Sequence, residues 1–389
     1  MFTKTSAPYH LILFLVAAAV LACAPMASYA DHGPKTMWQR QVKPYFTAHE
    51  TGMMGPFAIN VQTFGQKTSE HPAKPGSQDF DVFFKDRFNL AAVVRKKDEI
   101  VYSRFNAKRA IDGLTPLHGM SMSKTALGAS VGALLCDGSI GSLDEPMGLY
   151  ADSLKDTPYS NVTIRNVLQM NSGVTPRDGK NNRLANRMAM GLREYAGKAN
   201  VLDAVRLFKQ RLRQQGESHN YHSADSFALS LLVHDVTGKS AGQIFYENIF
   251  RDMNPIGQMH WATDNEGRTV SQARLVMNAH DWNAFGQFIL DEMARESCLG
   301  RFFKDGLETP IPTRRPNVGY GYHFWVYEVN GENVITMTGH GGFFNVLSRQ
   351  ENSVMSIFSL DPNYKAGNLF SKNVLAEIAA KVLPAPDGN

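Results

Sequence analysis

Cysteine is scarce in this sequence, and motifs that bind metal ions are missing from it. Three of the 389 residues are cysteine, and no Cys/His cluster has the spacing of a zinc site. A His-Glu-x-x-His motif is also absent. The sequence therefore predicts neither a metal ion nor a cofactor.

Charge of one sign is not in excess either. Lys and Arg number 40 against 36 Asp and Glu, and Lys4 is the only charged residue among the first 30. Without that segment the count is 39 against 36, a net charge of +3. Such a small and dispersed excess gives no indication of nucleic-acid binding, and no such partner is expected.

The N-terminus has an apolar run, but a short one. Leu11–Ala24 contains 14 residues, too few to span a bilayer comfortably. It follows Lys4 and precedes Ser28-Tyr29-Ala30, which places small residues at positions minus three and minus one of a cleavage site. Residues 1–30 are therefore predicted to be a signal peptide, and the mature protein to be periplasmic or secreted.

A lipoprotein signal is the alternative interpretation of this segment. Val20-Leu21-Ala22-Cys23 resembles a lipobox, and the protein would be membrane-attached only if Cys23 were lipidated. After cleavage at Ala30, Cys136 and Cys298 are the remaining cysteines. Cys136 ends a small, apolar segment, so we expect a buried thiol there and not a disulfide partner.

The length of the chain exceeds the usual limit of a single core, so a two-lobed domain or two domains are expected. Strand patterns lie at both ends and helical patterns between them. This order predicts an α/β fold: an antiparallel sheet flanked by helices, formed from both chain ends, with an inserted all-helical lobe. One domain would span 31–389, with a sheet lobe at about 31–140 and 316–389 and a helical lobe at about 141–315.

Individual elements follow from the hydrophobic periodicity. The segment 121–136 is rich in small residues and is expected to be a central, buried helix. The polar segment 178–186 is interpreted as a surface loop. The remaining predicted helices are 162–170, 202–212, 224–236, one opening at Ser240, 282–293 and 369–382. The predicted strands are 90–94, 100–103, 322–328, 334–337, 346–349 and 354–360, with a hairpin turn at Asn330-Gly331.

The chemistry of the chain is concentrated first in Ser121-Met122-Ser123-Lys124. Residues three apart lie on one helical face, so the Lys124 amine would stand beside the Ser121 hydroxyl. A serine becomes a nucleophile only with a base beside it, and Lys124 can be that base if its pKa falls. Taken alone, the pattern also fits an N-cap serine followed by a solvated lysine.

Two later segments add to this pair. Tyr221 precedes a predicted helix, and a tyrosine with a depressed pKa can relay protons to a leaving group. His340-Gly341-Gly342 lies between two predicted strands, where glycines let a ligand or another backbone approach closely.

Together these motifs resemble the serine β-lactamase and penicillin-recognising superfamily, nearest to its class C-like esterases, D-amino-acid peptidases and 6-aminohexanoate-dimer hydrolases. Ser121-Met122-Ser123-Lys124 matches the first motif of that family. Tyr221-His222-Ser223 occupies the place of Tyr-x-Asn, and His340-Gly341-Gly342 that of Lys-Thr-Gly. Segments 162–173 and 320–322 match as well, so the resemblance extends from about Leu90 to the C-terminus.

The resemblance implies a mechanism. Ser121 would attack a carbonyl and form an acyl-enzyme, with Lys124 and Tyr221 sharing the proton transfers. The backbone N–H groups of Ser121 and Phe343, the residue after Gly342, would form the oxyanion hole.

Two departures from the family pattern bear on the substrate. Ser223 replaces the asparagine that would contact a β-lactam amide, and His340 replaces the lysine that would attract a substrate carboxylate. Both favour a carboxylesterase or short-amide hydrolase acting on a small-molecule or short-peptide acyl substrate. The alternatives are a D-amino-acid peptidase or weak β-lactamase, and a non-catalytic binding protein that kept the fold. The oligomeric state does not follow from the sequence.

Overall fold

The computed structural model describes residues 60–66, 89–109, 111–192, 198–329 and 331–359. The predicted signal peptide and the predicted helix 369–382 lie outside these ranges. Within them, no helix has both the length and the apolar composition needed to cross a membrane.

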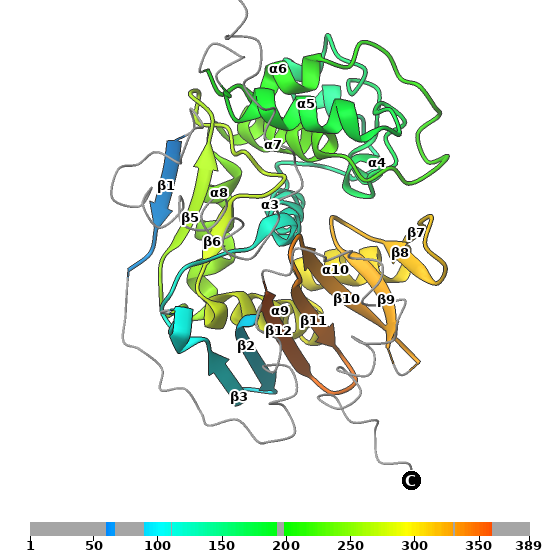
Figure 1. The fold of residues 1–389 in the computed structure, drawn as a ribbon. Coiled ribbons are helices and arrows are strands. Elements are labelled where there is room, and N and C mark those ends of the chain that lie inside the picture. Colours follow the sequence, from blue (N-terminus) through cyan, green and yellow to red (C-terminus); the bar gives the residue numbers. More distant parts are fainter. Residues whose placement is uncertain (1–59, 67–88, 110, 193–197, 330, 360–389) are drawn as a thin grey trace, which may run out of the picture.

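The larger sheet joins the two ends of the described chain (Figure 1). Its strand order is β3-β2-β12-β11-β10-β9-β8-β7, and every pairing is antiparallel. β2 pairs with β12, which confirms that early and late strands share one sheet. The strands are β2 (Asn89–Lys96), β3 (Glu99–Phe105), β7 (Ile311–Pro312), β8 (Val318–Tyr320), β9 (Trp325–Val329), β10 (Glu332–Gly339), β11 (Phe343–Ser348) and β12 (Ser353–Ser359).

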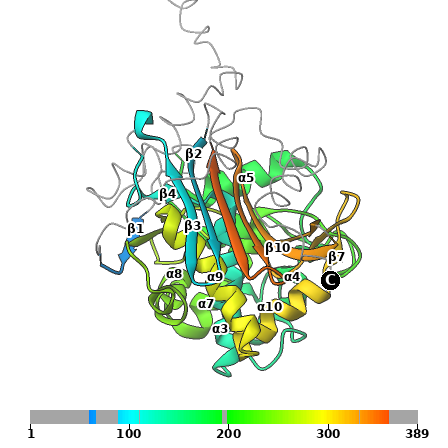
Figure 2. The same ribbon diagram turned by 90° about the horizontal axis from the view of Figure 1, so that it is seen from below.

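Two helices pack beside this sheet, as the view from below shows (Figure 2). α9 (Ala279–Ala294) lies against β2, β11 and β12, and α10 (Cys298–Glu308) lies against α9 and α3 (Ser123–Cys136). The Asn283 side chain of α9 donates to the backbone oxygens of Val93 and Val354. A buried amide that is satisfied in this way ties the helix to the adjacent strands β2 and β12.

α3 runs through the centre of the molecule, as its small residues predicted. Every residue from Ser123 to Leu134 is buried. Close packing explains the glycines, because a Cβ at Gly128 would stand 2.7 Å from the Tyr322 oxygen. The segment Ser121–Lys124 therefore leads into a helix that is packed on all sides.

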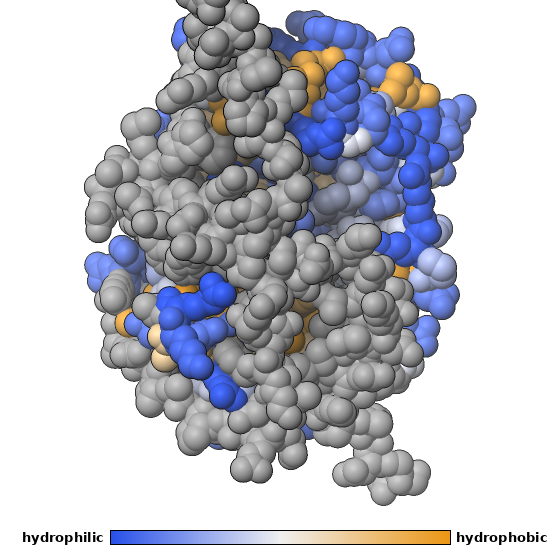
Figure 3. Space-filling model, in the orientation of Figure 1, coloured by the Kyte–Doolittle hydropathy of each residue, from blue (hydrophilic) through white to orange (hydrophobic). Residues whose placement is uncertain are grey.

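Further helices form a second lobe (Figure 1). The side of this lobe visible at the upper right of Figure 3 is mostly hydrophilic. Its helices are α4 (Ile164–Leu168), α5 (Gly179–Ala189), α6 (Val201–Arg206) and α7 (Ser223–Thr237). The helix α8 (Ala241–Asn248) instead packs mainly against α3. The predicted helix starting at Ser240 is confirmed, since the Ser240 hydroxyl accepts the Gln243 N–H as an N-cap.

The interpretation of 178–186 as a loop is wrong. α5 occupies most of this segment, and the Asp178 carboxylate caps it by accepting the Asn181 N–H at 2.7 Å. Only Ala185 and Ala189 are buried in this helix, so the apolar stripe is too narrow to register as helical periodicity. The N-cap aspartate was the available signal.

The middle of the chain is also not wholly helical. β5 (Met259–Thr263) and β6 (Leu275–Met277) form a second sheet with β1 (Asn60–Phe64) and β4 (Leu117–His118), in the order β1-β5-β6-β4. Both β5 and β6 are completely buried, so their residues do not alternate between apolar and polar. Short buried strands of this kind cannot be distinguished from helix by periodicity.

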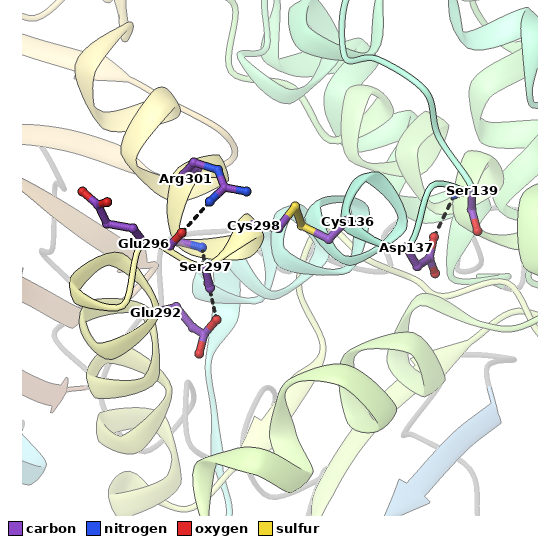
Figure 4. Close-up of a disulfide and its surroundings, with 9 residues drawn as sticks. Cys136, Asp137, Ser139, Glu292, Glu296, Ser297, Cys298 and Arg301 are labelled. Carbon is purple, nitrogen blue, oxygen red and sulfur yellow. Dashed lines mark hydrogen bonds between the residues drawn. A yellow bond between two sulfur atoms is a disulfide. The ribbon is translucent and has the colours of Figure 1, made fainter.

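The expectation for Cys136 is wrong as well, because it forms a disulfide with Cys298 (Figure 4). The bond joins the last residue of α3 to the first residue of α10 across a sequence separation of 162. The helix α10 is absent from the predicted elements, so the proximity of the two cysteines does not follow from the sequence predictions.

Candidate active site

Ser121 lies in a tight 3₁₀ turn between β4 and α3. The preceding residue, Met120, has a φ of +50°, a left-handed conformation that costs energy for a non-glycine residue. Three bonds hold the turn. The Met120 N–H donates to His118 Nδ1 at 2.7 Å, the Ser123 hydroxyl donates to the Met120 oxygen, and the Leu275 N–H donates to Ser123 Oγ. The strands β4 and β6, which contain His118 and Leu275, thus fix the conformation of the turn that holds Ser121.

Lys124 stands one turn further and faces Ser121. Its Nζ donates to Ser121 Oγ at 3.3 Å and to the backbone oxygen of Gln272. The Lys124 residue is 2% exposed, and this burial lowers the pKa of its amine to about 7. The structure therefore excludes a solvated helix lysine and gives Lys124 the depressed pKa that a base requires.

Tyr221 completes the group from the loop before α7. Lys124 Nζ lies 5.0 Å from the centre of the Tyr221 ring. Burial raises the pKa of Tyr221 to about 12, although a hydrogen bond with the Ser121 side chain acts in the opposite direction. The expected depressed pKa is thus wrong: desolvation disfavours the phenolate, and Tyr221 keeps its proton near neutral pH.

The segment His340-Gly341-Gly342 is the turn between β10 and β11. Both glycines have positive φ values of 98° and 96°. The preceding Gly339 lies directly against the turn that holds Ser121, because a Cβ there would be 2.7 Å from the Gly119 oxygen. Gly342 and the buried Phe343 therefore follow immediately after the point of contact, whereas His340 is exposed.

Ser223 has a different set of contacts. Its hydroxyl accepts from Asn186 Nδ2 at 3.1 Å, and its N–H donates to Asn182 Oδ1 at 2.9 Å. Both partners belong to α5. Ser223 thus ties the start of α7 to α5, a contact that the sequence analysis did not foresee because it predicted no helix there.

An aromatic wall stands behind Tyr221, formed by His219, Tyr221, Tyr320 and Trp325. The Tyr221 and Trp325 rings stack at 5.3 Å, and Tyr320 meets Tyr221 edge-on at 5.8 Å. His219 lies 4.9 Å from Tyr320. The sequence indicates two members of this wall, Tyr221 as a proton-transfer residue and Tyr320 as part of a family match, whereas His219 and Trp325 were not singled out. The wall holds the Tyr221 ring in place while its hydroxyl faces Ser121.

Buried histidines nearby carry no charge at neutral pH. Burial lowers the pKa of His222 to about 4 and that of His323 to about 3, and the Lys124 charge acts in the same direction on both. Lys124 is thus the group in this set that titrates near neutrality. Within the described ranges, no cluster of three or more His, Cys, Asp or Glu side chains could hold a metal ion.

Comparisons with known proteins agree with this geometry. A Beta-lactamase family model matches residues 80–368. A solved structure from Bacillus anthracis, assigned as a 6-aminohexanoate-dimer hydrolase, shares 18% identity over 85% of this chain and 92% of that chain, with a TM-score of 0.71. No curated protein matches.

Two further structures show the same fold at lower identity. A D-stereospecific amidohydrolase from Streptomyces sp. shares 16% identity, with 79% of this chain and 98% of that chain covered and a TM-score of 0.58. A family VIII carboxylesterase shares 13%, with 82% and 100% covered and a TM-score of 0.59. Because the family match extends over well more than half of the sequence, the chain belongs to the Beta-lactamase family.

Proposed function

We propose that this protein is an exported serine hydrolase that cleaves an ester or amide through an acyl-enzyme on Ser121. The contact between Lys124 Nζ and Ser121 Oγ at 3.3 Å carries the proposal. A buried amine with a pKa of about 7 is partly neutral at physiological pH, so it can accept the serine proton.

In the first step, Lys124 takes the proton of Ser121 as Oγ attacks the carbonyl carbon of the substrate. The carbonyl oxygen gains the negative charge and is held by the N–H groups of Ser121 and Phe343. Each such donor contributes about 3 to 4 kcal/mol in comparable sites. The contact of Gly339 with the Gly119 backbone supports this role, since it brings the start of β11 beside the nucleophile turn.

In the second step, the tetrahedral intermediate collapses and the bond to the leaving group breaks. Tyr221 gives its proton to the leaving oxygen or nitrogen and receives one from protonated Lys124. Its raised pKa suits this role, because the phenol is protonated at the start. Water then attacks the acyl-enzyme with the same residues acting in reverse, and the acid product leaves.

Export is proposed on two grounds. The predicted signal peptide is one, with lipidation of Cys23 as the alternative to cleavage after Ala30. The other is the Cys136–Cys298 disulfide, since such bonds persist in oxidising compartments such as the periplasm.

Covalent labelling tests the proposed nucleophile. A fluorophosphonate probe should label the wild type, and Ser121→Ala should abolish labelling while circular dichroism shows a folded protein. Ser139→Ala, an exposed serine after α3, is the matched control and should label normally. Undiminished labelling of Ser121→Ala would remove Ser121 as the nucleophile, and an unlabelled wild type would favour the non-catalytic binding protein.

A substrate panel then ranks the enzymatic alternatives. Short-chain p-nitrophenyl esters should be hydrolysed, with nitrocefin slow or absent, because Ser223 is bonded to α5 and His340 is not a lysine. Efficient nitrocefin turnover would make β-lactamase activity the leading function. Cleavage of D-alanyl peptides would instead favour a D-amino-acid peptidase.

A further inference from the structure

An arginine stands against the aromatic wall. Arg315 lies in the loop between β7 and β8, and its guanidinium carbon is 4.8 Å from the centre of the Trp325 ring. Its Nη1 donates to the Tyr327 hydroxyl at 3.1 Å. Since Trp325 also stacks on Tyr221, the guanidinium lies within about 10 Å of the Tyr221 ring.

No carboxylate neutralises this arginine. Among the described residues, Arg315 forms no ion pair, and Tyr327 is the side chain that accepts a hydrogen bond from its guanidinium. Arg314, Arg213 and Arg177 likewise lack a carboxylate partner in the part of the chain that is described. A guanidinium has five N–H donors, so Arg315 can still bind a planar anion.

The positive field of these arginines reaches the site. Burial lowers the pKa of His219 to about 4, and Arg315 and Arg314 lower it further. Burial also lowers the pKa of Arg213, with Arg177 adding to the effect and Glu217 opposing it. Like charges gathered without an ion pair of their own are unfavourable in the free protein, and an anionic ligand would relieve this.

We propose that Arg315 binds a carboxylate of the substrate and so directs the enzyme to anionic esters or amides. This inference rests on the proposed function and narrows its substrate class. The sequence pointed instead to neutral substrates, because His340 is a poor partner for a carboxylate. Arg315 offers a permanent cation from a different element, and its planar fork can hold both carboxylate oxygens.

The carboxylate could belong to either side of the bond that is cleaved. An acyl chain ending in a carboxylate and a leaving group that carries one present the same anion to Arg315. Two pairs of matched esters separate these sources. The acyl pair is the mono-p-nitrophenyl ester of glutarate and p-nitrophenyl pentanoate. The leaving-group pair is 3-acetoxybenzoate and 3-acetoxybenzamide.

The measured quantity is the ratio of kcat/KM for the anionic ester to that for its neutral match. We expect Arg315→Gln to lower this ratio by about tenfold or more for one of the two pairs, the usual scale of a lost charge-assisted contact. Arg315→Lys should retain part of the ratio, because it keeps the charge but not the fork. Arg251→Gln, an exposed arginine near the small sheet, is the matched control and should keep the wild-type ratio.

Ionic strength gives a readout that needs no variant. The wild-type ratio should fall as NaCl rises from 20 to 500 mM, and this comparison decides the matter if Arg315→Gln does not fold. A ratio that changes neither with salt nor in Arg315→Gln would overturn the proposal; if Arg315→Gln does not fold, a ratio that changes neither with salt nor in Arg315→Lys would do so. Failure of the proposed function looks different: neither member of any pair would be hydrolysed, and Ser121 would not be labelled.

Discussion

The proposed role of Lys124 depends on its burial. A solvated lysine is protonated at neutral pH and cannot accept a proton, whereas the buried Lys124 has a pKa of about 7. The cost of burying an amine is offset by its contacts with Ser121 and the Gln272 oxygen. Burial also keeps Tyr221 protonated, so the proposed mechanism draws both its base and its acid from one desolvated site.

The pH dependence of activity follows from this. Below about pH 7 Lys124 is protonated and inactive as a base, so kcat/KM for a neutral ester should rise as pH increases through about 7 and then level off. His222 and His323 titrate near 4 and 3 and should add nothing above pH 5.5. The measurement is p-nitrophenyl acetate hydrolysis from pH 5.5 to 9. A flat profile would mean that Lys124 is not the titrating base.

Single substitutions at the two proton-transfer residues should each lower ester turnover by about 10²-fold or more. Lys124→Ala removes the base, and Tyr221→Phe removes only the hydroxyl while the ring can still stack on Trp325. Their effects should be less than additive in the double variant, because both residues serve one proton path. Near-wild-type turnover in either single variant would indicate a different base or acid.

At the scale of elements, the start of α7 contains a buried carboxylate that the mechanism does not use. Asp225 Oδ1 accepts hydrogen bonds from the Tyr159 hydroxyl at 2.6 Å and from Ser172 Oγ at 3.0 Å. Burial raises the pKa of Asp225 to about 7 despite these bonds. Its Oδ2 has no hydrogen-bond partner. The carboxylate thus links α7 to the α4 region at a cost in stability once it is charged.

Asp225→Asn tests this cost. A carboxyl whose folded pKa is raised stabilises the fold below its unfolded pKa near 4, and loses that contribution as pH rises toward about 7. The loss is at most about 4 kcal/mol. Asparagine keeps the Oδ1 acceptor without the charge, so the variant should lose less stability than the wild type between pH 4.5 and 8. Thermal unfolding at both pH values measures this, and parallel losses in the two proteins would contradict it.

Local signals determined how much of these elements was predictable. Apolar runs, small residues or turn signals predicted β2, β3 and β9 to β12 of the large sheet and the helices α3, α7 and α9, whereas the short strands β7 and β8 were not predicted. The Ser121–Lys124 pair follows directly from helical spacing. α5 was missed because few of its residues are buried, and β5 and β6 because all of theirs are. The importance of Arg315 depends on the β7–β8 loop packing against β9, a tertiary contact with no local signal.

At the scale of the whole molecule, α3 connects the parts that make the site. Its first turn carries Lys124 next to Ser121, its middle packs against α7 and α8, and its last residue is bonded to α10. The turn at His340 reaches the same point from the large sheet. Residues from the two sheets and the helical lobe therefore meet at the start of one helix, and fixing this helix fixes their geometry.

The Cys136–Cys298 disulfide should therefore stabilise the molecule more than it affects the chemistry. It closes a loop of 162 residues, and loss of a native disulfide costs about 2 to 5 kcal/mol. Yet Cys136 is 12 residues beyond Lys124, or about 18 Å along the helix, so the site itself lies far from the bond. The double variant Cys136→Ser/Cys298→Ser should melt at a lower temperature but keep near-normal kcat/KM at 20 °C.

Reduction provides the matched comparison. Dithiothreitol should lower the melting temperature of the wild type to about that of the double variant, and should leave the double variant unchanged. The same comparison bears on export. Protein made in a reducing cytosol should melt at the temperature of the double variant, and protein made in the periplasm should melt at the temperature of the oxidised wild type. A wild type whose melting temperature ignores dithiothreitol, while free thiols become titratable, would show that the bond forms but does not hold α3 and α10 together.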